Sequence, residues 1–565
     1  MLDQNEMKPN KNQKDENQEQ EVGIMAPTPC CSDCIIVDPA NGCSVREGIG
    51  TTASGVASHA EGFQTIASNL ASHAEGESTI ASDIRAHAEG AFTIASGVAS
   101  HAEGQATIAS GNTSHAEGFR TIASGDSAHA EGRDFGLKQT QAIGDASHAE
   151  GQGTTANGVA SHTEGRNTTT GVNALAAHAE GLDTTASGEA SHAEGRNTTA
   201  GGLSSHAEGR NTVANETASH AEGRNTTASG EASHAEGGFT TASGAFSHAE
   251  GDGTTADVTS AHAEGQGTLA HSTASHAEGI STTASGEASH SEGFHTNASG
   301  NDSHAEGSFT IASGFASHAE GDNTTANGRF SHAEGTFTST NIFDGAHIMG
   351  KFGDADESYS WFLANGTSVL NKGLAAKIST AGFGVSDRGW RGGGADYAEM
   401  FETVDEKPID IGYFVTLEGK KIRKANATDD YILGIVSADP AILADSGELR
   451  WKDKYVTDEW NRVQYHDVVI PAEKDKDGNV IVPERTEKQP ILNPNWDPTK
   501  EYIPRSERPE WVEVGLLGKL RVRDDGTCQM NGYCKPNDEG IAMASDKGYR
   551  VMERTGPNQI LVLFK

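Results

Sequence analysis

A 14-residue repeat running through half of the chain constrains its fold more than any other feature. Between Thr51 and Gly335 the units read S-H-A-E-G-x-x-T-x-A-S-G-x-A, and 20 histidines mark their register. The spacing departs from 14 in two places, with 19 residues after His129 and 16 after His162. Self-similarity at a fixed period of this kind is typical of a stacked solenoid, in which each coil packs only on its neighbours.

Each unit contains two short stretches, S-H-A-E and T-x-A, that are bounded by turn residues. Both are too short for a helix, and β-branched residues recur in the second stretch, for example Ile66, Ile80 and Thr155, which favours strands. We expect the two glycines of each unit to supply the positive φ of tight turns. Twenty coils stacked at about 4.8 Å predict a rod on the order of 95 Å long.

Side-chain alternation assigns the faces of these strands. The alanine of S-H-A-E is replaced only by Thr163 and Ser291, so this position requires a small residue and is predicted to point inward. The Thr and Ala of T-x-A are predicted to point inward as well. An interior of Ala, Ser and Thr buries little apolar area at about 25 cal/mol per Å², so a single roll is expected to be marginally stable and to pack against other chains.

The histidine and glutamate of S-H-A-E are present in all 20 units and point outward together. Three interpretations are open: a solvated charged face, metal-binding columns, or an interface between chains in which each His donates to a Glu of its own or a neighbouring chain. Buried carboxylates need such partners. We predict the interface, and expect no metal and no cofactor.

The units resemble the YadA-like head repeats of trimeric adhesins over residues 48–340. In that family the equivalent pentapeptide is S-V-A-I-G, followed by S-x-A-x-G, so that His and Glu here replace Val and Ile. The resemblance implies an all-β, left-handed parallel β-roll or solenoid that forms homotrimers. Because His and Glu replace the apolar pair, we expect a His–Glu ladder that weakens when Glu is protonated.

The charge of the chain restricts its partners. The formal net charge is -38, which argues against nucleic acids and anionic membranes, since both require basic surfaces. The segment 1–47 is predicted to be disordered. Its first part, Met1 to Gln20, is rich in Asn, Gln, Lys and Glu and is predicted to be neither a signal peptide nor a transmembrane segment.

Six cysteines form two groups. The first group precedes the repeats and consists of Cys30, Cys31, Cys34 and Cys43. Four thiolates can in principle hold zinc, but their spacing matches no common zinc module, so cross-links between chains or reduced thiols are the favoured alternatives. The second group, Cys528 and Cys534, is compatible with either a disulfide or buried thiols.

The composition changes after residue 340. All six tryptophans lie beyond this point, and short apolar runs bounded by turn residues occur at 412–417, 431–436, 512–517 and 560–564. Such runs are typical of buried strands. We therefore predict a mostly-β globular domain over 395–565, joined to the roll by a connector over 341–394. The isolated His347 and His466 are interpreted as structural.

The connector ends in three glycines, which are followed by Asp396-Tyr397-Ala398-Glu399. One interpretation of D-x-x-E is structural, with Asp396 as the N-cap and Glu399 at the third position of a short helix. The other is a pair of carboxylates beside flexible backbone, suited to acid/base hydrolysis of the neighbouring peptide bond.

The C-terminal segments GADYAEMFE, YILGIVSADP and YIPRSERPEWVEVGLLGKLRVRDDGTC are similar to the intramolecular-chaperone autocleavage domain of phage neck-appendage and tail-fibre proteins, a glutamic-type self-cleaving peptidase. The resemblance implies a domain that helps a trimeric fibre assemble and then cuts itself off. It implies Ala395–Asp396 as the cleaved bond and Asp396 and Glu399 as the catalytic carboxylates. Glu399 would then act as a general base, and Asp396 would polarise the carbonyl or protonate the leaving amine.

Two functions follow from these features. The first is a homotrimeric fibre on a virion, spore or cell surface that matures by self-cleavage. The alternative is a non-cleaving structural or adhesive fibre whose C-terminal domain acts only as a trimer cap. A host-surface or glycan ligand is compatible with both, and we expect no nucleic acid partner and no membrane insertion.

Overall fold

The computed structural model describes residues 35–389, 391–447, 449, 452–474, 478, 480–482 and 484–565. It divides into two compact units, Met1–Arg388 and Gly389–Lys565. The described residues form strands and three short 3-10 turns, η1 (Pro39–Asn41), η2 (Lys452–Lys454) and η3 (Arg505–Glu507). Among them there is no helix of the length and hydropathy that a membrane span requires. The interpretations of Cys30, Cys31 and Cys34 fall outside the described residues.

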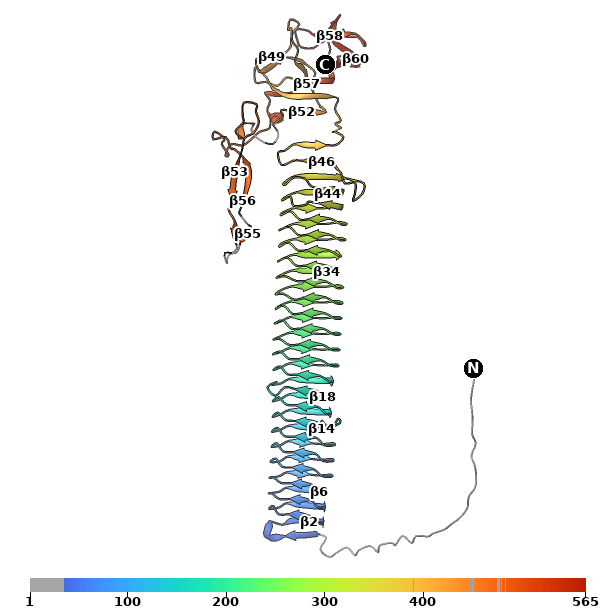
Figure 1. The fold of residues 1–565 in the computed structure, drawn as a ribbon, viewed down its shortest axis with the longest axis vertical. Coiled ribbons are helices and arrows are strands. Elements are labelled where there is room, and N and C mark those ends of the chain that lie inside the picture. Colours follow the sequence, from blue (N-terminus) through green and yellow to red (C-terminus); the bar gives the residue numbers. More distant parts are fainter. Residues whose placement is uncertain are drawn as a thin grey trace, which may run out of the picture. The chain divides into compact units, whose positions relative to one another are not determined.

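The first unit is a parallel β-solenoid, as predicted, with about 23 turns rather than the 20 coils expected from the repeats (Figure 1). Strand β1 (Ile35–Asp38) pairs antiparallel with β2 (Ser44–Ile49) and closes one end. The histidine-bearing strands then run from β4 (His59–Phe63) to β42 (His332–Ala333), and they alternate with strands of the T-x-A stretch from β3 (Thr52–Ala53) to β43 (Thr336–Ser339).

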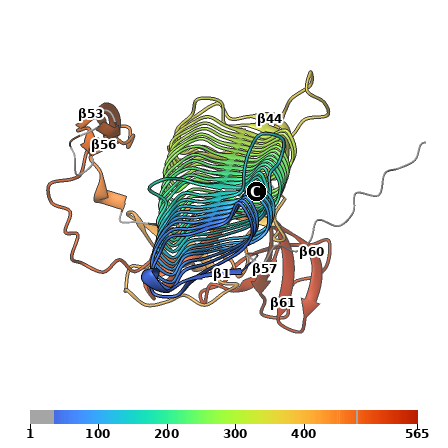
Figure 2. The same ribbon diagram turned by 90° about the horizontal axis from the view of Figure 1, so that it is seen from below.

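Identical residues lie above one another in successive coils. His101 pairs with His115 and Ala102 with Ala116 in a parallel ladder, and the same register recurs through the repeats. Seen from its end, successive coils have nearly the same flattened outline, each displaced slightly from the one before (Figure 2). The repeat therefore converts one set of side-chain positions into columns that run along the solenoid.

The interior of the solenoid is made of small side chains, as the alternation predicts. Ala60 and Ala67 are fully buried, and so are Thr65 and its equivalents in the other coils. Most coils also bury a serine before the column histidine, and the Oγ of Ser58 donates to the carbonyl of Gly55. The outward neighbour Ile66 is partly exposed. The buried core of these coils thus consists of alanine columns with little apolar area per coil.

The two glycines of each unit serve different purposes. Gly62 has a φ of 107°, and a Cβ added to it would lie 2.1 Å from the carbonyl oxygen of Gly76 in the next coil. Gly55 does not have positive φ, but a Cβ there would lie 2.0 Å from the carbonyl of Asn69. The left-handed conformation at that turn falls instead on Ala57, at φ 56°. The prediction of positive φ at both glycines is therefore correct for the first and wrong for the second, where close backbone approach requires glycine.

The coils continue past residue 340. Strand β44 (His347–Asp354) and strand β45 (Trp361–Asn365) add parallel rungs. Strands β46 (Leu374–Ile378) and β47 (Gly384–Ser386) then pair antiparallel. Most of the segment predicted as a connector is thus part of the solenoid sheet. Larger side chains, Ile348 and Phe362, are buried in these last coils.

The second unit is built on a ten-stranded sheet. Its strands are β48 (Asp396–Glu402), β49 (Phe414–Glu418), β50 (Lys421–Lys424), β51 (Gly434–Val436), β52 (Ile442–Ala444), β57 (Trp511–Arg523), β58 (Tyr533–Pro536), β59 (Ala542–Ser545), β60 (Tyr549–Gly556) and β61 (Gln559–Phe564). Phe414, Ile435, Val522 and Ile560 are buried in its core. The long strand β57 pairs with β48, β51 and β61, so it organises the domain.

Between β52 and β57 in the sequence, two two-stranded antiparallel sheets form a ribbon. Strand β53 (Tyr465–Ile470) pairs antiparallel with β56 (Arg485–Pro490), and β54 (Glu473–Lys474) pairs with β55 (Val480–Val482). His466 is exposed on this ribbon. The predicted catalytic residues Asp396 and Glu399 lie outside the ribbon, on strand β48 of the main sheet.

Candidate functional site

The segment that carries the two predicted catalytic residues is a strand. Asp396 begins β48, which pairs antiparallel with β57 and parallel with β52. The prediction of a helix capped by Asp396 is therefore wrong. The alternation of buried Asp396, Ala398 and Met400 with partly exposed Tyr397 and Glu399 has the period of a strand, and the backbone groups of β48 are used in the two ladders.

Asp396 and Glu399 of one chain lie on opposite faces of the sheet. Side chains of a strand alternate between faces, so residues three apart point in opposite directions. Asp396 points to the buried face. On the other face the Tyr397 hydroxyl donates to Glu399 Oε1 at 2.6 Å, and this hydrogen bond raises the pKa of Tyr397. The structure thus does not bring the two carboxylates together within one chain.

The peptide predicted to be cleaved is held against β57. The backbone N–H of Lys519 donates to the carbonyl oxygen of Ala395 at 3.1 Å, and the N–H of Ala441 donates to the carbonyl of Asp396 at 2.9 Å. At Gly518, where φ is 128°, an added Cβ would lie 2.4 Å from the Ala395 oxygen. A donor on the Ala395 carbonyl favours the negative charge that develops there during attack by water.

The Asp396 carboxyl is buried without full hydrogen bonding. The residue is 7% exposed, and its Oδ2 is inaccessible and has no hydrogen-bond partner among the described residues. A Cβ added to Gly515 would lie 2.8 Å from this oxygen. Burial is the largest cause that raises the pKa of Asp396; a hydrogen bond from Ser437 lowers it, and the charge of Asp439 raises it. The carboxyl therefore holds its proton to a higher pH than a solvent-exposed aspartate does.

A cavity of about 730 Å³ opens beside this peptide. One wall is the chain from Gly394 to Asp396, the second is the segment 437–439 after β51, and the third comes from β57 between Lys519 and Arg523. Glu399 is absent from the described lining. Ala395, whose carbonyl accepts from Lys519, is thus among the residues that line the cavity.

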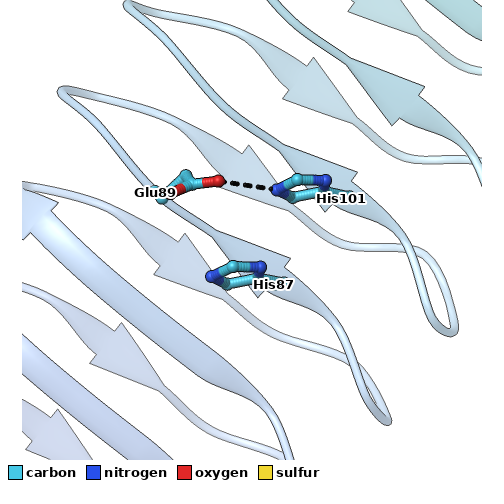
Figure 3. Close-up of side chains that lie close together, drawn as sticks. All are labelled: His87, Glu89 and His101. Carbon is cyan, nitrogen blue, oxygen red and sulfur yellow. Dashed lines mark hydrogen bonds and ion pairs between the residues drawn. The ribbon is translucent and has the colours of Figure 1, made fainter.

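The histidine and glutamate columns of the solenoid form a ladder within one chain. Glu89 Oε1 lies 3.0 Å from His101 Nε2 of the following coil (Figure 3), and the next two rungs have distances of 3.1 Å. Successive rings stack with centroids 4.7 Å apart at His87 and His101. The side chains of this pair remain about one-third exposed, so the face is neither buried nor fully solvated in a single chain.

Neighbouring coils shift the pKa values of several groups in these columns. Burial and the neighbouring histidines lower the pKa of His87, and the same causes lower that of His332 to about 4. A hydrogen bond with Glu164 is the largest cause that raises the pKa of both Glu150 and Glu180 to about 7, whereas the pKa of Glu164 is lowered by the same contacts. Among these groups, His87 and His332 are shifted toward the neutral imidazole, and Glu150 and Glu180 are shifted toward the protonated carboxyl.

The same columns contain groups of His, Glu and His whose ligand atoms lie within 4.8 Å of one another. Zinc binds imidazole nitrogen at about 2.1 Å, so two such bonds span at most about 4.2 Å. Parallel rings stacked 4.7 Å apart also direct their nitrogen lone pairs side by side rather than toward a shared ion. Rings would have to move for one ion to bind two histidines, so this geometry does not favour a metal centre.

The sequence did not predict the full structural role of His347, and it left the state of Cys528 and Cys534 open. His347 stacks on His332 at 4.5 Å and continues the column, with Trp361 beyond it; the spacing of His347 to Gly350, equal to that of H-A-E-G, was the available signal. Cys528 and Cys534 are free and buried, which agrees with the thiol alternative. Burial raises the pKa of Cys534 to about 12.

Comparisons with known proteins match both parts of the chain. The family described as Peptidase_G2, IMC autoproteolytic cleavage domain, matches residues 364–559. The YadA head domain repeat matches residues 179–205, 221–247 and 305–331.

Individual relatives match the C-terminal part. The pre-neck appendage protein of Bacillus phage B103 is 39% identical over 163 residues, which is 29% of this chain and 17% of that protein. The putative phage-related protein YobO of Bacillus subtilis strain 168 is 32% identical over 161 residues, or 28% of this chain and 19% of that protein. The C-terminal fragment of gene product 12 of bacteriophage phi29, a solved structure, is 34% identical and covers 30% of this chain and 100% of the fragment, with a TM-score of 0.25. The chain thus spans less than a fifth of the length of these curated relatives.

Proposed function

Because residues 364–559 belong to the Peptidase_G2 family of IMC autoproteolytic cleavage domains and follow YadA head repeats, we propose that this chain forms a homotrimeric fibre that matures by self-cleavage. The C-terminal domain assists assembly and then cuts the bond between Ala395 and Asp396. The observation that carries the proposal is the buried Asp396 carboxyl, which lies next to a peptide whose carbonyl already accepts a hydrogen bond from Lys519.

The proposed reaction is hydrolysis of one peptide bond. A water oxygen bonds to the Ala395 carbonyl carbon while a carboxylate takes a proton from that water. The Lys519 N–H stabilises the oxyanion. The bond from carbon to the Asp396 nitrogen then breaks, and the protonated Asp396 carboxyl supplies the proton that the leaving amine needs. One water is consumed, and the new ends are a carboxylate at Ala395 and an amine at Asp396.

The carboxylate that activates water is proposed to be Glu399 of a second chain. Within one chain Glu399 lies on the opposite face of β48 from Asp396, and the cavity beside the Ala395 carbonyl is large enough to admit a side chain. Cleavage then depends on assembly, because an isolated chain lacks the base at the reacting carbon.

Assembly as a trimer is supported by the solenoid. Its coils bury alanine columns that supply little hydrophobic stabilisation for their surface, and the His–Glu face is about one-third exposed. Packing this face against two further chains would remove more surface from water. The matching relatives are named as phage appendage proteins, which supports a place on a virion; a spore or cell surface is the alternative.

The first experiment compares the wild-type chain with Glu399→Gln. We expect wild type to yield two fragments, 1–395 and 396–565, and the variant to remain at 59.0 kDa when intact masses are measured. Glu402→Gln is the matched control on the same strand, because Glu402 pairs with Lys421 outside the cavity, and it should cleave normally. Two fragments from both wild type and Glu399→Gln would remove Glu399 from the mechanism. An intact wild-type chain would favour the non-cleaving trimer cap.

The second experiment tests whether the two carboxylates come from different chains. Glu399→Gln and Asp396→Asn chains, each carrying a different affinity tag, are co-expressed. If Glu399 acts across chains, the Asp396→Asn chain supplies the missing base and the Glu399→Gln chain is cut. If both carboxylates act within one chain, neither tagged chain is cut in the mixture. Light scattering of the intact proteins measures whether the assembly contains three chains.

A further inference from the structure

The cavity beside Asp396 is also lined by a second carboxylate residue, Asp439. We propose that Asp439, on the turn after β51, is a positioning residue of the cleavage site that acts on Asp396 through its negative charge in the cavity that both residues line. This inference rests on the proposed self-cleavage and assigns a residue that the D-x-x-E motif does not contain.

The backbone places Asp439 beside the peptide that is cut. The segment from Ser437 to Ala441 runs along the chain before β48: the Ala441 N–H binds the Asp396 carbonyl at 2.9 Å, and a Cβ added to Gly394 would lie 2.5 Å from the Asp439 carbonyl oxygen. Both aspartates line the cavity of about 730 Å³. Glu399 of the same chain faces the other side of the strand, where Tyr397 binds it.

The surroundings of Asp396 contain charges of both signs. From β57 the cavity is lined by Lys519, Arg521 and Arg523, and the ends of β60 and β61 contribute uncharged Asn558, Gln559 and Leu561. From the turn come Ser437 and Asp439. Burial raises the pKa of Asp396 most, the Ser437 hydrogen bond opposes that shift, and the negative charge of Asp439 adds to it. Ser437 and Asp439 therefore act on the same carboxyl in opposite directions.

In this arrangement Asp396 and Asp439 have different roles in the proposed reaction. Asp396 must hold a proton until the bond to its own nitrogen breaks, because an amide nitrogen is a poor leaving group without one. Asp439, exposed on the turn, adds a negative charge near Asp396 that disfavours ionisation of this neighbour. It forms and breaks no bond in the reaction.

The test measures how the rate of self-cleavage depends on pH. Full-length chains are made by cell-free synthesis, transferred to buffers from pH 5.5 to 8.5, and followed by loss of the intact band and by mass. Asp439→Asn keeps the shape of the residue and removes its charge. We expect its loss of activity at high pH to begin about 0.5 to 1 pH unit lower than in wild type, with a rate at pH 7.5 reduced about threefold to tenfold.

Two further variants complete the test. Ser437→Ala removes the hydrogen bond that opposes the effect of Asp439, so the loss of activity at high pH should begin at a higher pH than in wild type. Asp430 is exposed and lies outside the cavity, so Asp430→Asn should leave the pH profile unchanged. If Asp439→Asn fails to fold, the shift of Ser437→Ala and retention of the wild-type profile by Asp439→Glu become the deciding measurements.

The outcomes separate this inference from the proposed function. A wild-type chain that never cleaves overturns both. A wild-type chain that cleaves while Asp439→Asn gives a superimposable pH profile overturns the role of Asp439 alone. Equal loss of rate at every pH would also overturn it, because that result indicates a purely structural role.

Discussion

Two adjacent glycines in the solenoid provide a sharp test of how its coils stack. Gly237 has a φ of 96°, and a Cβ there would lie 2.3 Å from the carbonyl oxygen of Gly251 in the next coil. At Gly238 φ is not positive, and the nearest atom to an added Cβ is Asp252 Oδ1, at the end of a side chain, at 3.1 Å. The perturbation is the substitution of each glycine by alanine.

The cost at Gly237 has two parts. An alanine at this φ is strained by about 1–3 kcal/mol. Relief of the clash requires the coils to separate by about 1 Å, since carbon and carbonyl oxygen approach to about 3.3 Å. That movement breaks the bond from the Gly238 N–H to the Gly251 oxygen, now 2.8 Å, at about 1 kcal/mol. We expect a total of about 2–4 kcal/mol for Gly237→Ala. Gly238→Ala should change stability by less than about 1 kcal/mol, in the stabilising direction.

The assay is hydrogen exchange of the full chain, followed by mass spectrometry. Repeat arrays open locally, so a global melting curve would dilute the effect. Amides over residues 234–251 should exchange about 25-fold faster or more in Gly237→Ala, because each 1.4 kcal/mol corresponds to a factor of ten. Gly238→Ala should stay within about tenfold of wild type. Equal protection in both variants would refute the close approach of backbones as the reason for glycine.

Three further predictions concern the columns and the cores. The pKa of His332 is lowered to about 4 from an unfolded value near 6.5, so the folded state binds fewer protons between these values and its stabilising contribution is lost as pH falls through that window. This histidine alone contributes about 2 kcal/mol after allowance for its partial exposure, and a melting temperature at pH 4.5 equal to that at pH 7 would contradict the prediction. Cys528 and Cys534, buried with raised pKa values, should resist alkylation at pH 8 until the chain is unfolded, whereas exposed Cys43 should react at once. Ala228→Leu places three extra carbons in a filled column and should destabilise its coil by about 1–3 kcal/mol; faster proteolysis near residue 228 would report it, and unchanged cleavage would argue for a looser interior.

The sequence predicts the solenoid well because the inward-facing, outward-facing and turn positions all repeat together in every unit. Small residues at the Ala60 position, the outward His59 and Glu61, and the glycine at each turn all point to the same coil, and one coil determines the next. The limit of the solenoid was harder to predict. His347 and Trp361 continue the stack although their coils no longer contain S-H-A-E-G, since larger side chains such as Ile348 fill the interior there.

The site was predictable only in part. The motif that contains Asp396 and Glu399 fits a capped helix as well as a strand by local chemistry, and the choice is made by pairing with β57, which lies more than 100 residues away in the sequence. The same long-range pairing brings Lys519 to the Ala395 carbonyl. Because β51 also pairs with β57, the turn after β51, which contains Asp439, lies beside Asp396. No local pattern reports these contacts, because each joins segments whose separation is set by the sheet.

A strand, rather than a helix, changes what the D-x-x-E motif can do. On a helix the two carboxylates would lie on one face and could act together as soon as a single chain folded. On β48 they point to opposite faces, so one chain presents its Asp396 inward to its own cavity and its Glu399 outward. If Glu399 serves a neighbour, the proposed cleavage is suppressed in every unassembled chain by the geometry of the strand itself, and no separate inhibitor is needed. This idea is tested by moving the base to the face of β48 that carries Asp396. A chain with both Glu399→Gln and Ala398→Glu should cleave without assembly if only the position of the base matters. If that chain remains intact while the co-expressed pair is cut, the neighbour supplies more than one carboxylate to the reaction.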